Sequence, residues 1–224
     1  MGFKTFKSDI NSIRQRDPAA RSFIEVFLLY SGVWAVINYR ISHWFFKRKL
    51  RFIARWISQC ARFSTGIEIH PGAEIGNGLF IDHGMGVVIG ETTIIGDNCT
   101  IYQGVTLGGT GKESGKRHPT LGNNVMIGAG AKVLGPFKVG DNSKIAAGAV
   151  VLNEIPPDST AVGVPARIVK QSGQRTDMDQ INIPDPISQE FCRLSARIEK
   201  LEKELIERTA ETEKSSAEHE KKEK

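Results

Sequence analysis

The stretch Val88-Ile-Gly-Glu-Thr-Thr-Ile-Ile-Gly-Asp-Asn-Cys-Thr-Ile101 has an aliphatic residue at every sixth position, at Ile89, Ile95 and Ile101. The same step continues on both sides of it, and glycine follows several of the aliphatic residues directly. Such a period is typical of a solenoid in which short strands turn a corner at each repeat and one aliphatic side chain per repeat points inward. The sequence therefore predicts a parallel β-helix over residues 67–170.

The six-residue register slips by two residues at two places. The first slip holds Asp82-His83-Gly84, and the second inserts the polar, glycine-rich loop that runs from Gly108 to Thr120. Extra residues in a repeat protein gather on one binding face. We therefore expect the functional residues at these two breaks.

Residues 1–66 are predicted to be helical, because apolar residues recur there at steps of three and four. Asp17-Pro18 is typical of a helix start, with Asp as the cap and Pro at the first helical position. The apolar run 26–37 is shorter than the roughly 20 residues that span a bilayer, and we expect it to form one buried helix. A second pattern over residues 41–57 predicts a helix whose aromatic stripe faces the core.

After residue 170 the repeat ends, and residues 171–186 are predicted to form a polar linker. Apolar residues then alternate steps of four and three over residues 187–208, which predicts a short coiled-coil helix whose Ile and Leu seam does not decide the strand number. The charged residues 209–224 are expected to be disordered. The predicted fold is α+β: an N-terminal helical region, a β-helix and a C-terminal coiled-coil helix.

Charge and cysteine usage limit the class of protein. The net charge of +5 is concentrated at the front, where residues 1–66 carry 12 Lys and Arg against 3 Asp and Glu. Most such clusters are solvated faces, so we expect neither a nucleic-acid partner nor a membrane span. The three cysteines are scattered and form no metal-binding pair. With no signal-peptide pattern at the amino terminus, these features favour a cytoplasmic protein without a metal.

Histidine is the side chain whose pKa suits proton transfer near neutrality. His43 lies in an aromatic helix and His219 in the charged tail, so we expect both to be structural or exposed. His83 follows Asp82 and lies fifteen residues after Glu68, close to the eighteen of one three-sided coil. A carboxylate on one ring nitrogen would leave the other free to remove a proton from a hydroxyl, although an Asp-His pair also fits a simple turn.

Arg117-His118 ends the inserted loop, and a guanidinium is well matched to a carboxylate through two parallel hydrogen bonds. Glycines at the start of the loop would let backbone amides approach a ligand. The loop lacks the strand, phosphate-binding sequence and helix of a P-loop, so ATP is not expected. These residues predict a site for an acid.

Together these segments resemble a serine O-acetyltransferase of the hexapeptide-repeat acyltransferase superfamily. The most diagnostic strings are Arg16-Asp-Pro and the loop that joins Gly-Gly-Thr-Gly-Lys112 to Arg117-His-Pro119. The other matching strings are Ile67-Glu-Ile-His-Pro71, Ile81-Asp-His83, Val88-Ile-Gly-Glu-Thr92, Met126-Ile-Gly-Ala-Gly-Ala131 and Gly163-Val-Pro-Ala-Arg167. The resemblance implies a left-handed β-helix and a trimer with each active site between two protomers.

The resemblance also implies direct transfer of an acetyl group from acetyl-CoA to the hydroxyl of L-serine, which yields O-acetylserine and CoA. The histidine that matches His83 is the general base, and the aspartate that partners it in the family falls on Glu68. The positions matching Asp17 and Asp82 would hold the ammonium group of serine.

The remaining implied contacts involve the carboxylate of serine and the second substrate. Arg117 and His118 match the residues that hold the carboxylate. Acetyl-CoA would lie in the groove between subunits, without a metal, near residues toward the carboxyl-terminal coils. The expected contacts are Gly109, Ala129, Lys132, Ala147 and Arg167.

Departures from the family pattern bear on assembly and partners. Longer relatives carry additional amino-terminal helices that join two trimers, whereas Arg16-Asp-Pro begins near the start here. We therefore expect a homotrimer. The heptads offer another way in which two trimers could associate into a dimer of trimers. Relatives commonly end in a tail that inserts into O-acetylserine sulfhydrylase. This chain matches that tail at Asp177-Met-Asp-Gln180 and then diverges, which argues against that complex. Feedback inhibition by L-cysteine is expected, because the serine ligands are present.

Three other functions stay open at this point. The same scaffold could acetylate a sugar or another small hydroxyl acceptor. A zinc hydratase could use His70, His83 and His118 across subunits, although its close histidine spacing is absent. A trimeric scaffold without catalysis would need only the solenoid and the coiled coil.

Overall fold

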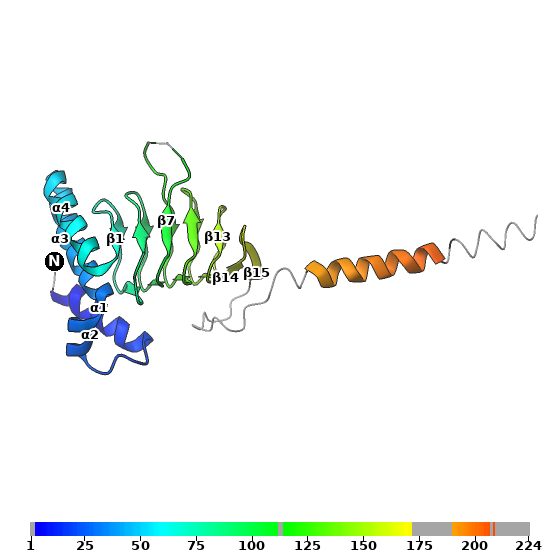
Figure 1. Cartoon of the computed structure of the whole chain (residues 1–224), viewed down its shortest axis with the longest axis horizontal. Coiled ribbons are helices and arrows are strands. Elements are labelled where there is room, and N and C mark those ends of the chain that lie inside the picture. Colours follow the sequence, from blue (N-terminus) through cyan, green and yellow to red (C-terminus); the bar gives the residue numbers. More distant parts are fainter. Residues whose placement is uncertain (1–2, 112–113, 172–189, 207, 209–224) are drawn as a thin grey trace, which may run out of the picture. The chain divides into compact units, whose positions relative to one another are not determined.

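A computed structural model of the chain describes residues 3–111, 114–171, 190–206 and 208, which belong to two compact units, residues 1–183 and 184–224. In the described part of the first unit, helices come first and short strands follow (Figure 1). The helices are α1 (Phe3–Arg16), α2 (Phe23–Leu29), α3 (Ser31–Lys47) and α4 (Arg51–Thr65).

The strands form three sheets, whose neighbours pair in parallel except for the antiparallel pair β14 and β15. Sheet A holds β1 (Glu68–Ile69), β4 (Val88–Ile89), β7 (Thr106–Gly108), β10 (Lys132–Leu134) and β13 (Val150–Val151). Sheet B holds β2 (Glu74–Ile75), β5 (Ile94–Ile95), β8 (Thr120–Leu121) and β11 (Lys138–Val139). Sheet C holds β3 (Phe80–Ile81), β6 (Thr100–Ile101), β9 (Met126–Ile127), β12 (Lys144–Ile145), β14 (Ser159–Val162) and β15 (Arg167–Gln171).

The six-residue positions form the core of this three-sided prism. Each points inward from its strand, and all except the half-buried Ile75 are buried. The predicted β-helix is therefore confirmed. The positions are Ile69, Ile75, Ile81, Ile89, Ile95, Ile101, Leu107, Leu121, Ile127, Val133, Val139, Ile145 and Val151.

Two edges of the prism carry the register slips. The turns from sheet C to sheet A form one edge, called here the His83 edge, with residues 82–87, 102–105, 128–131 and 146–149. The turns from sheet A to sheet B form the His118 edge, with residues 70–73, 90–93, 109–111, 114–119 and 135–137. Figure 1 shows the loop after β7 leaving the wall of the prism on this edge. Sheet A lies between the two edges.

The helices pack onto the first coil of the β-helix. Phe80 of β3 lies in a buried cluster with residues of α1, α2 and α3. The Arg16 side chain donates hydrogen bonds to the carbonyl oxygens of Gly78, Asn98 and Cys99 and to the Thr100 hydroxyl. Arg16 therefore ties the end of α1 to two coils and fixes the position of Asp17, which follows it.

The predicted helix start at Asp17-Pro18 is wrong. α1 ends at Arg16, and α2 begins only at Phe23, where the Ser22 hydroxyl accepts the Glu25 amide. Asp17 Oδ1 instead accepts the amide of Ala19 at 2.8 Å, which closes a turn rather than a helix.

The prediction of one buried helix over residues 26–37 is also wrong. The chain is extended at Tyr30, and α2 and α3 meet there at 71°. α3 comes so close to β3 that a Cβ on Gly32 would lie 2.3 Å from the Ile81 carbonyl oxygen, while Leu28 and Leu29 of α2 are exposed. Among the described residues no single helix meets the length and hydropathy of a bilayer span; α2 and α3 do so only as a bent pair.

The aromatic stripe predicted over residues 41–57 does not face the core in a single chain. Trp44, Phe52 and Trp56 are exposed, and Phe52 retains 81% of its accessible area. The single helix predicted there is also wrong, because α3 ends at Lys47 and α4 begins at Arg51. Phe52 and Trp56 are exposed because α4 turns its small residues inward, with Ala54, Ser58, Ala61 and Thr65 buried.

In the second unit the structure describes a helix at residues 190–206. This confirms that a carboxyl-terminal helix is present, while the domain boundaries and the coiled coil stay predictions. The predicted linker beyond residue 171, the tail-like string at 177–180 and the tail at 209–224 lie outside the described residues.

Candidate active site

The turn after β3 presents His83 to solvent. His83 has a backbone φ of +56°, and glycines with positive φ follow at Gly84 and Gly86. The hydroxyl of Ser31, at the start of α3, donates to the His83 carbonyl oxygen at 3.2 Å. The imidazole is 74% exposed, with Nε2 4.0 Å from Oδ1 of Asp82. The register slip after β3 thus places the His83 imidazole in solvent at the edge of sheet A.

The carboxylate of Asp82 lies beside this ring, and the charge of Asp17 acts on Asp82. Asp17 Oδ2 accepts the Tyr30 hydroxyl at 2.5 Å. Burial and this hydrogen bond raise the pKa of Tyr30 to about 12, and the charge of Asp82 adds to the rise. Burial raises the pKa of Asp82 as well, opposed by His83 and assisted by the charge of Asp17. Two mutually repelling carboxylates in one place favour a bound cation.

Glu68 lies on β1 near the same edge but contacts other groups. Its carboxylate oxygens lie 3.1 Å from Arg62 Nη1 and 3.8 Å from Arg55 Nη2, both on α4. In the single chain the recorded ion-pair partner of His83 is Asp82. The pairing of Glu68 with His83 stays a prediction.

Arg117 and His118 lie on the other edge. Arg117 Nη2 is 2.6 Å from Oε2 of Glu91, and this hydrogen bond holds the pKa of Glu91 below its usual range. The His118 ring is buried, with Nδ1 2.9 Å from the Thr92 hydroxyl. Burial and the charge of Arg117 lower the pKa of His118. Arg117 and His118 therefore set a cation next to an imidazole whose charged form is disfavoured.

The residues expected to contact acetyl-CoA divide between the edges. Ala129 and Ala147 lie on the His83 edge, where the Gly148 amide donates to the Ala129 carbonyl. A Cβ on Gly148 would meet nothing within 4 Å, and the same holds for Gly130, so this edge offers open backbone. Lys132, on sheet A beside this edge, donates to the Gly104 carbonyl.

The other two expected contacts lie elsewhere. Gly109 is on the His118 edge, where a Cβ would come 3.0 Å from the Arg117 carbonyl oxygen. Arg167 is exposed on β15.

Sequence reasoning assigned no role to several residues that organise the site. Tyr30 sat inside an apolar run that indicates a helix core, so nothing in the pattern marked its hydroxyl. Glu91 and Thr92 belong to a string that matches the family, which is the only signal that pointed to them. Arg16 was part of a diagnostic motif, but its role as an anchor for Asp17 needs the folded coils.

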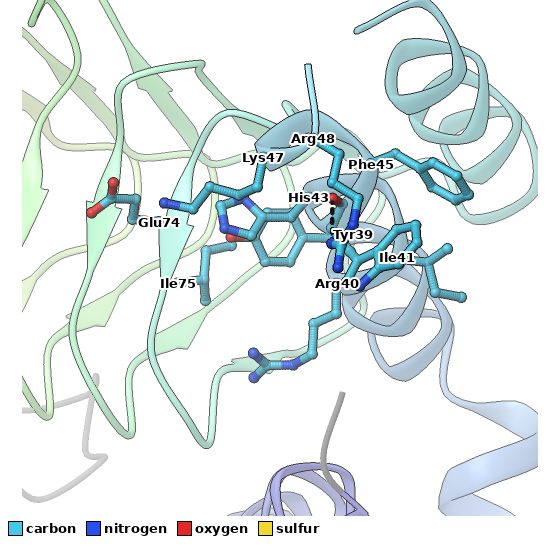
Figure 2. A pocket seen from close by; sticks show the side chains of 10 residues that line it. Tyr39, Arg40, Ile41, His43, Phe45, Lys47, Arg48, Glu74 and Ile75 are labelled. Carbon is cyan, nitrogen blue, oxygen red and sulfur yellow. Dashed lines mark hydrogen bonds between the residues drawn. The ribbon is translucent and has the colours of Figure 1, made fainter. Parts of the chain in front are cut away.

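A cavity of about 870 Å³ lies between α3 and β2, next to the first turn of the His118 edge (Figure 2). None of the predicted site residues lines it. The His43 ring nitrogen Nδ1 is bonded to the Pro71 carbonyl at 2.8 Å, and Tyr39 donates to the Ala73 carbonyl at 2.6 Å. Its polar aromatic groups therefore serve the fold.

Within one chain the three histidines considered for zinc do not converge. His70 and His118 interact on the His118 edge, whereas His83 lies across sheet A. Within the described ranges no group of three His, Cys, Asp or Glu side chains could hold a metal ion.

Comparisons with known proteins agree with the repeat. Residues 118–153 match the family described as bacterial transferase hexapeptide (six repeats), and residues 86–109 match the hexapeptide repeat of succinyl-transferase. The serine acetyltransferase of Bacillus pumilus is 56% identical over 96% of this chain and 100% of its own length. That of Bacillus subtilis is 55% identical over 93% of this chain and 97% of its own.

The chain belongs to the serine acetyltransferase family. Its fold is accordingly the left-handed parallel β-helix of hexapeptide repeats, and it is an acetyl-CoA-dependent transferase.

Solved serine acetyltransferases show the same fold. One in complex with cysteine is 44% identical, with a TM-score of 0.79 over 80% of this chain and 71% of that chain. The Brucella abortus serine acetyltransferase in complex with coenzyme A is 45% identical, with a TM-score of 0.74 over 76% of this chain and 68% of that chain. The Neisseria gonorrhoeae serine acetyltransferase in complex with serine is 42% identical, with a TM-score of 0.72 over 75% of this chain and 68% of that chain.

Proposed function

We propose that the chain transfers the acetyl group of acetyl-CoA directly to the hydroxyl of L-serine, with His83 as the general base. The observation that carries this is the exposed His83 imidazole beside the carboxylate of Asp82, on which the charge of Asp17 also acts. The neutral ring takes the hydroxyl proton while the serine oxygen attacks the thioester carbonyl. The protonated ring then gives a proton to the departing CoA thiolate, which leaves O-acetylserine, CoA and neutral His83.

The two polar ends of serine match the two edges. Asp17 and Asp82 supply negative charge for the ammonium group. Arg117 and His118 supply donors for the carboxylate, and the guanidinium can exchange its contact with Glu91 for the substrate. Burying either end of serine without a partner would cost a few kcal/mol.

One chain cannot bring both edges to one serine. Residues 87–90 cross sheet A between them and span about 10 Å at about 3.3 Å per residue. The ammonium and carboxylate of serine, by contrast, share a single carbon. A homotrimer in which the His83 edge of one protomer faces the His118 edge of the next would complete each site.

The His83 edge also fits the second substrate. Its turns stack from the base toward Ala129 and Ala147, and the open glycines beside them leave amides and carbonyls accessible. An extended thioester arm along this edge would end at the imidazole. Lys132 and Arg167 are the proposed phosphate partners, and Gly109 would approach from the neighbouring protomer.

Glu68 is the proposed electrostatic support for the base. Its carboxylate lies on the same side of sheet A, and in the single chain Arg62 and Arg55 hold it. A negative charge there would stabilise the imidazolium that forms when His83 takes the serine proton.

Cysteine should compete for the same site, because it carries the same ammonium and carboxylate as serine. We place the enzyme in the cytoplasm, since Cys60, Cys99 and Cys192 are all free thiols. A complex with O-acetylserine sulfhydrylase is not part of the proposal.

Replacement of the base tests this function. His83→Ala should lower the rate of CoA release at least about 100-fold, with the product identified as O-acetylserine in the wild type. His43→Ala is the matched control, because that ring bonds the Pro71 carbonyl and packs against the Tyr39 ring. Unchanged turnover in His83→Ala would reject the base, and acetylation of sugars in place of serine would reject the substrate.

A further inference from the structure

Thr92 holds the Arg117-His118 segment from the neighbouring turn of the His118 edge. Its hydroxyl oxygen accepts the backbone amides of Arg117 and His118, each at 3.1 Å. The same oxygen lies 2.9 Å from Nδ1 of the His118 ring, and the Thr92 amide donates to that nitrogen at 3.2 Å. One residue therefore contacts both the backbone and the ring.

These contacts decide where the ring proton lies. A backbone amide can only donate, so His118 Nδ1 must offer it a lone pair. The Thr92 hydroxyl has two lone pairs, which the two amides occupy, and so its own hydrogen points to Nδ1. With Nδ1 accepting from both groups, the proton of the neutral ring is on Nε2.

The surroundings of the ring favour this state. His118 retains 8% of its accessible area, and burial beside Arg117 disfavours a charged imidazole. The ring lies directly over Gly90, where a Cβ would come 2.2 Å from Nε2. Only glycine admits the ring there. Within the described part of the chain, the hydrogen bonds of the ring all involve Nδ1, which leaves Nε2–H to donate elsewhere.

We propose that Thr92 is a positioning residue that fixes His118 as the neutral tautomer protonated at Nε2, so that the ring donates one hydrogen bond to a carboxylate oxygen of the amino-acid substrate. The inference rests on the proposed role of Arg117 and His118 in holding that carboxylate. Arg117 supplies the positive charge and His118 a directional, uncharged donor. The opposite tautomer would present a lone pair to the carboxylate and repel it.

Steady-state kinetics of three variants test the positioning role. Thr92→Val keeps the shape of the side chain but removes the hydroxyl, and we expect it to raise KM for serine about tenfold with KM for acetyl-CoA within about twofold. Thr92→Ser keeps the hydroxyl and should restore KM for serine to within about threefold of wild type. Thr93→Val is the matched control, because the buried Thr93 hydroxyl has no hydrogen-bond partner among the described residues.

His118→Ala separates the two proposals. An unchanged KM for serine in His118→Ala would overturn the proposed carboxylate contact itself. A raised KM in His118→Ala together with an unchanged KM in Thr92→Val would overturn the role of Thr92 alone.

The tautomer can be observed without substrate. In the full-length protein with ¹⁵N-labelled histidine, the His118 signals, assigned by their loss in His118→Asn, should show a protonated Nε2 and an unprotonated Nδ1 at neutral pH. In Thr92→Val the signals should move toward a mixture of tautomers. A wild-type ring protonated at Nδ1, or at both nitrogens, would overturn the inference whatever the kinetics show.

Discussion

Tyr30 supports the carboxylate of Asp17, the proposed ligand of the ammonium group, through a single oxygen. Its hydroxyl donates to Asp17 Oδ2 at 2.5 Å, and its raised pKa of about 12 keeps that hydrogen in place at assay pH. The folded state favours the protonated phenol, so the bond is present below the usual tyrosine pKa near 10 and is lost only as pH rises toward 12. Tyr30→Phe should therefore raise KM for serine about fivefold while kcat stays within about twofold.

Tyr39→Phe provides the comparison for this variant. Tyr39 also donates a short hydrogen bond, to the buried Ala73 carbonyl at 2.6 Å in the first turn of the His118 edge, and not to Asp17. Its loss should lower the melting temperature without changing KM for serine. Equal KM values in the two variants would show that Asp17 needs no support from Tyr30.

Residues of the site differ in how far the sequence could predict them. His83 could be found because it sits where the six-residue register slips, which is a local feature of the chain. Tyr30 could not, because its hydroxyl matters only once Arg16 has fixed Asp17 against the second coil. Thr92 could not either, since its partners Arg117 and His118 lie 25 and 26 residues further along the chain.

The helices and strands also differ in how far the sequence could predict them. The inward position of each strand repeats locally, so the β-helix follows from the sequence. The end of α2 at Leu29 does not, because it depends on how closely Gly32 approaches Ile81 of β3. Likewise, the exposure of Phe52 follows from the small residues that α4 turns toward the prism.

The helix at residues 190–206 presents an exposed apolar seam. Its residues at the a and d heptad positions all retain half or more of their accessible area: Phe191, Leu194, Ile198, Leu201 and Leu205. In a parallel, in-register coiled coil the g position of one helix faces the next e position of its partner, which sets Arg197 against Glu202. An antiparallel pair that overlaps the whole helix would set Arg197 against its own copy. Charge therefore favours parallel self-association.

Self-association of this helix is testable in the full chain. Leu201→Asp should raise the protein concentration at which the assembly dissociates at least about tenfold, because it places a charge in the seam. Lys203→Asp, on the opposite face, should leave dissociation unchanged in sedimentation measurements. Arg197→Glu should weaken the assembly and Glu202→Arg in the same chain should restore it. Failure of that restoration would contradict the parallel register.

At the scale of the whole molecule, the fold separates the parts of the site. His83 and Asp82, the proposed base and one proposed ammonium ligand, lie on the His83 edge. The proposed carboxylate ligands Arg117 and His118 lie on the His118 edge, with sheet A between the two edges. Each edge is built within a single chain by short turns. In the proposed trimer the two kinds of edge would meet three times, so that catalysis and assembly would depend on the same surfaces.

Hybrid assemblies test this division. His83→Ala and Arg117→Ala should each be inactive alone, because each chain lacks one half of the site. Coexpressed in equal amounts, they should regain activity, since about one quarter of the sites in randomly mixed trimers join an intact His83 edge to an intact Arg117. His83→Ala coexpressed with Asp82→Ala should regain none, because both changes fall on the same edge. An inactive first mixture, with hybrids verified by native mass spectrometry, would place the whole site within one protomer.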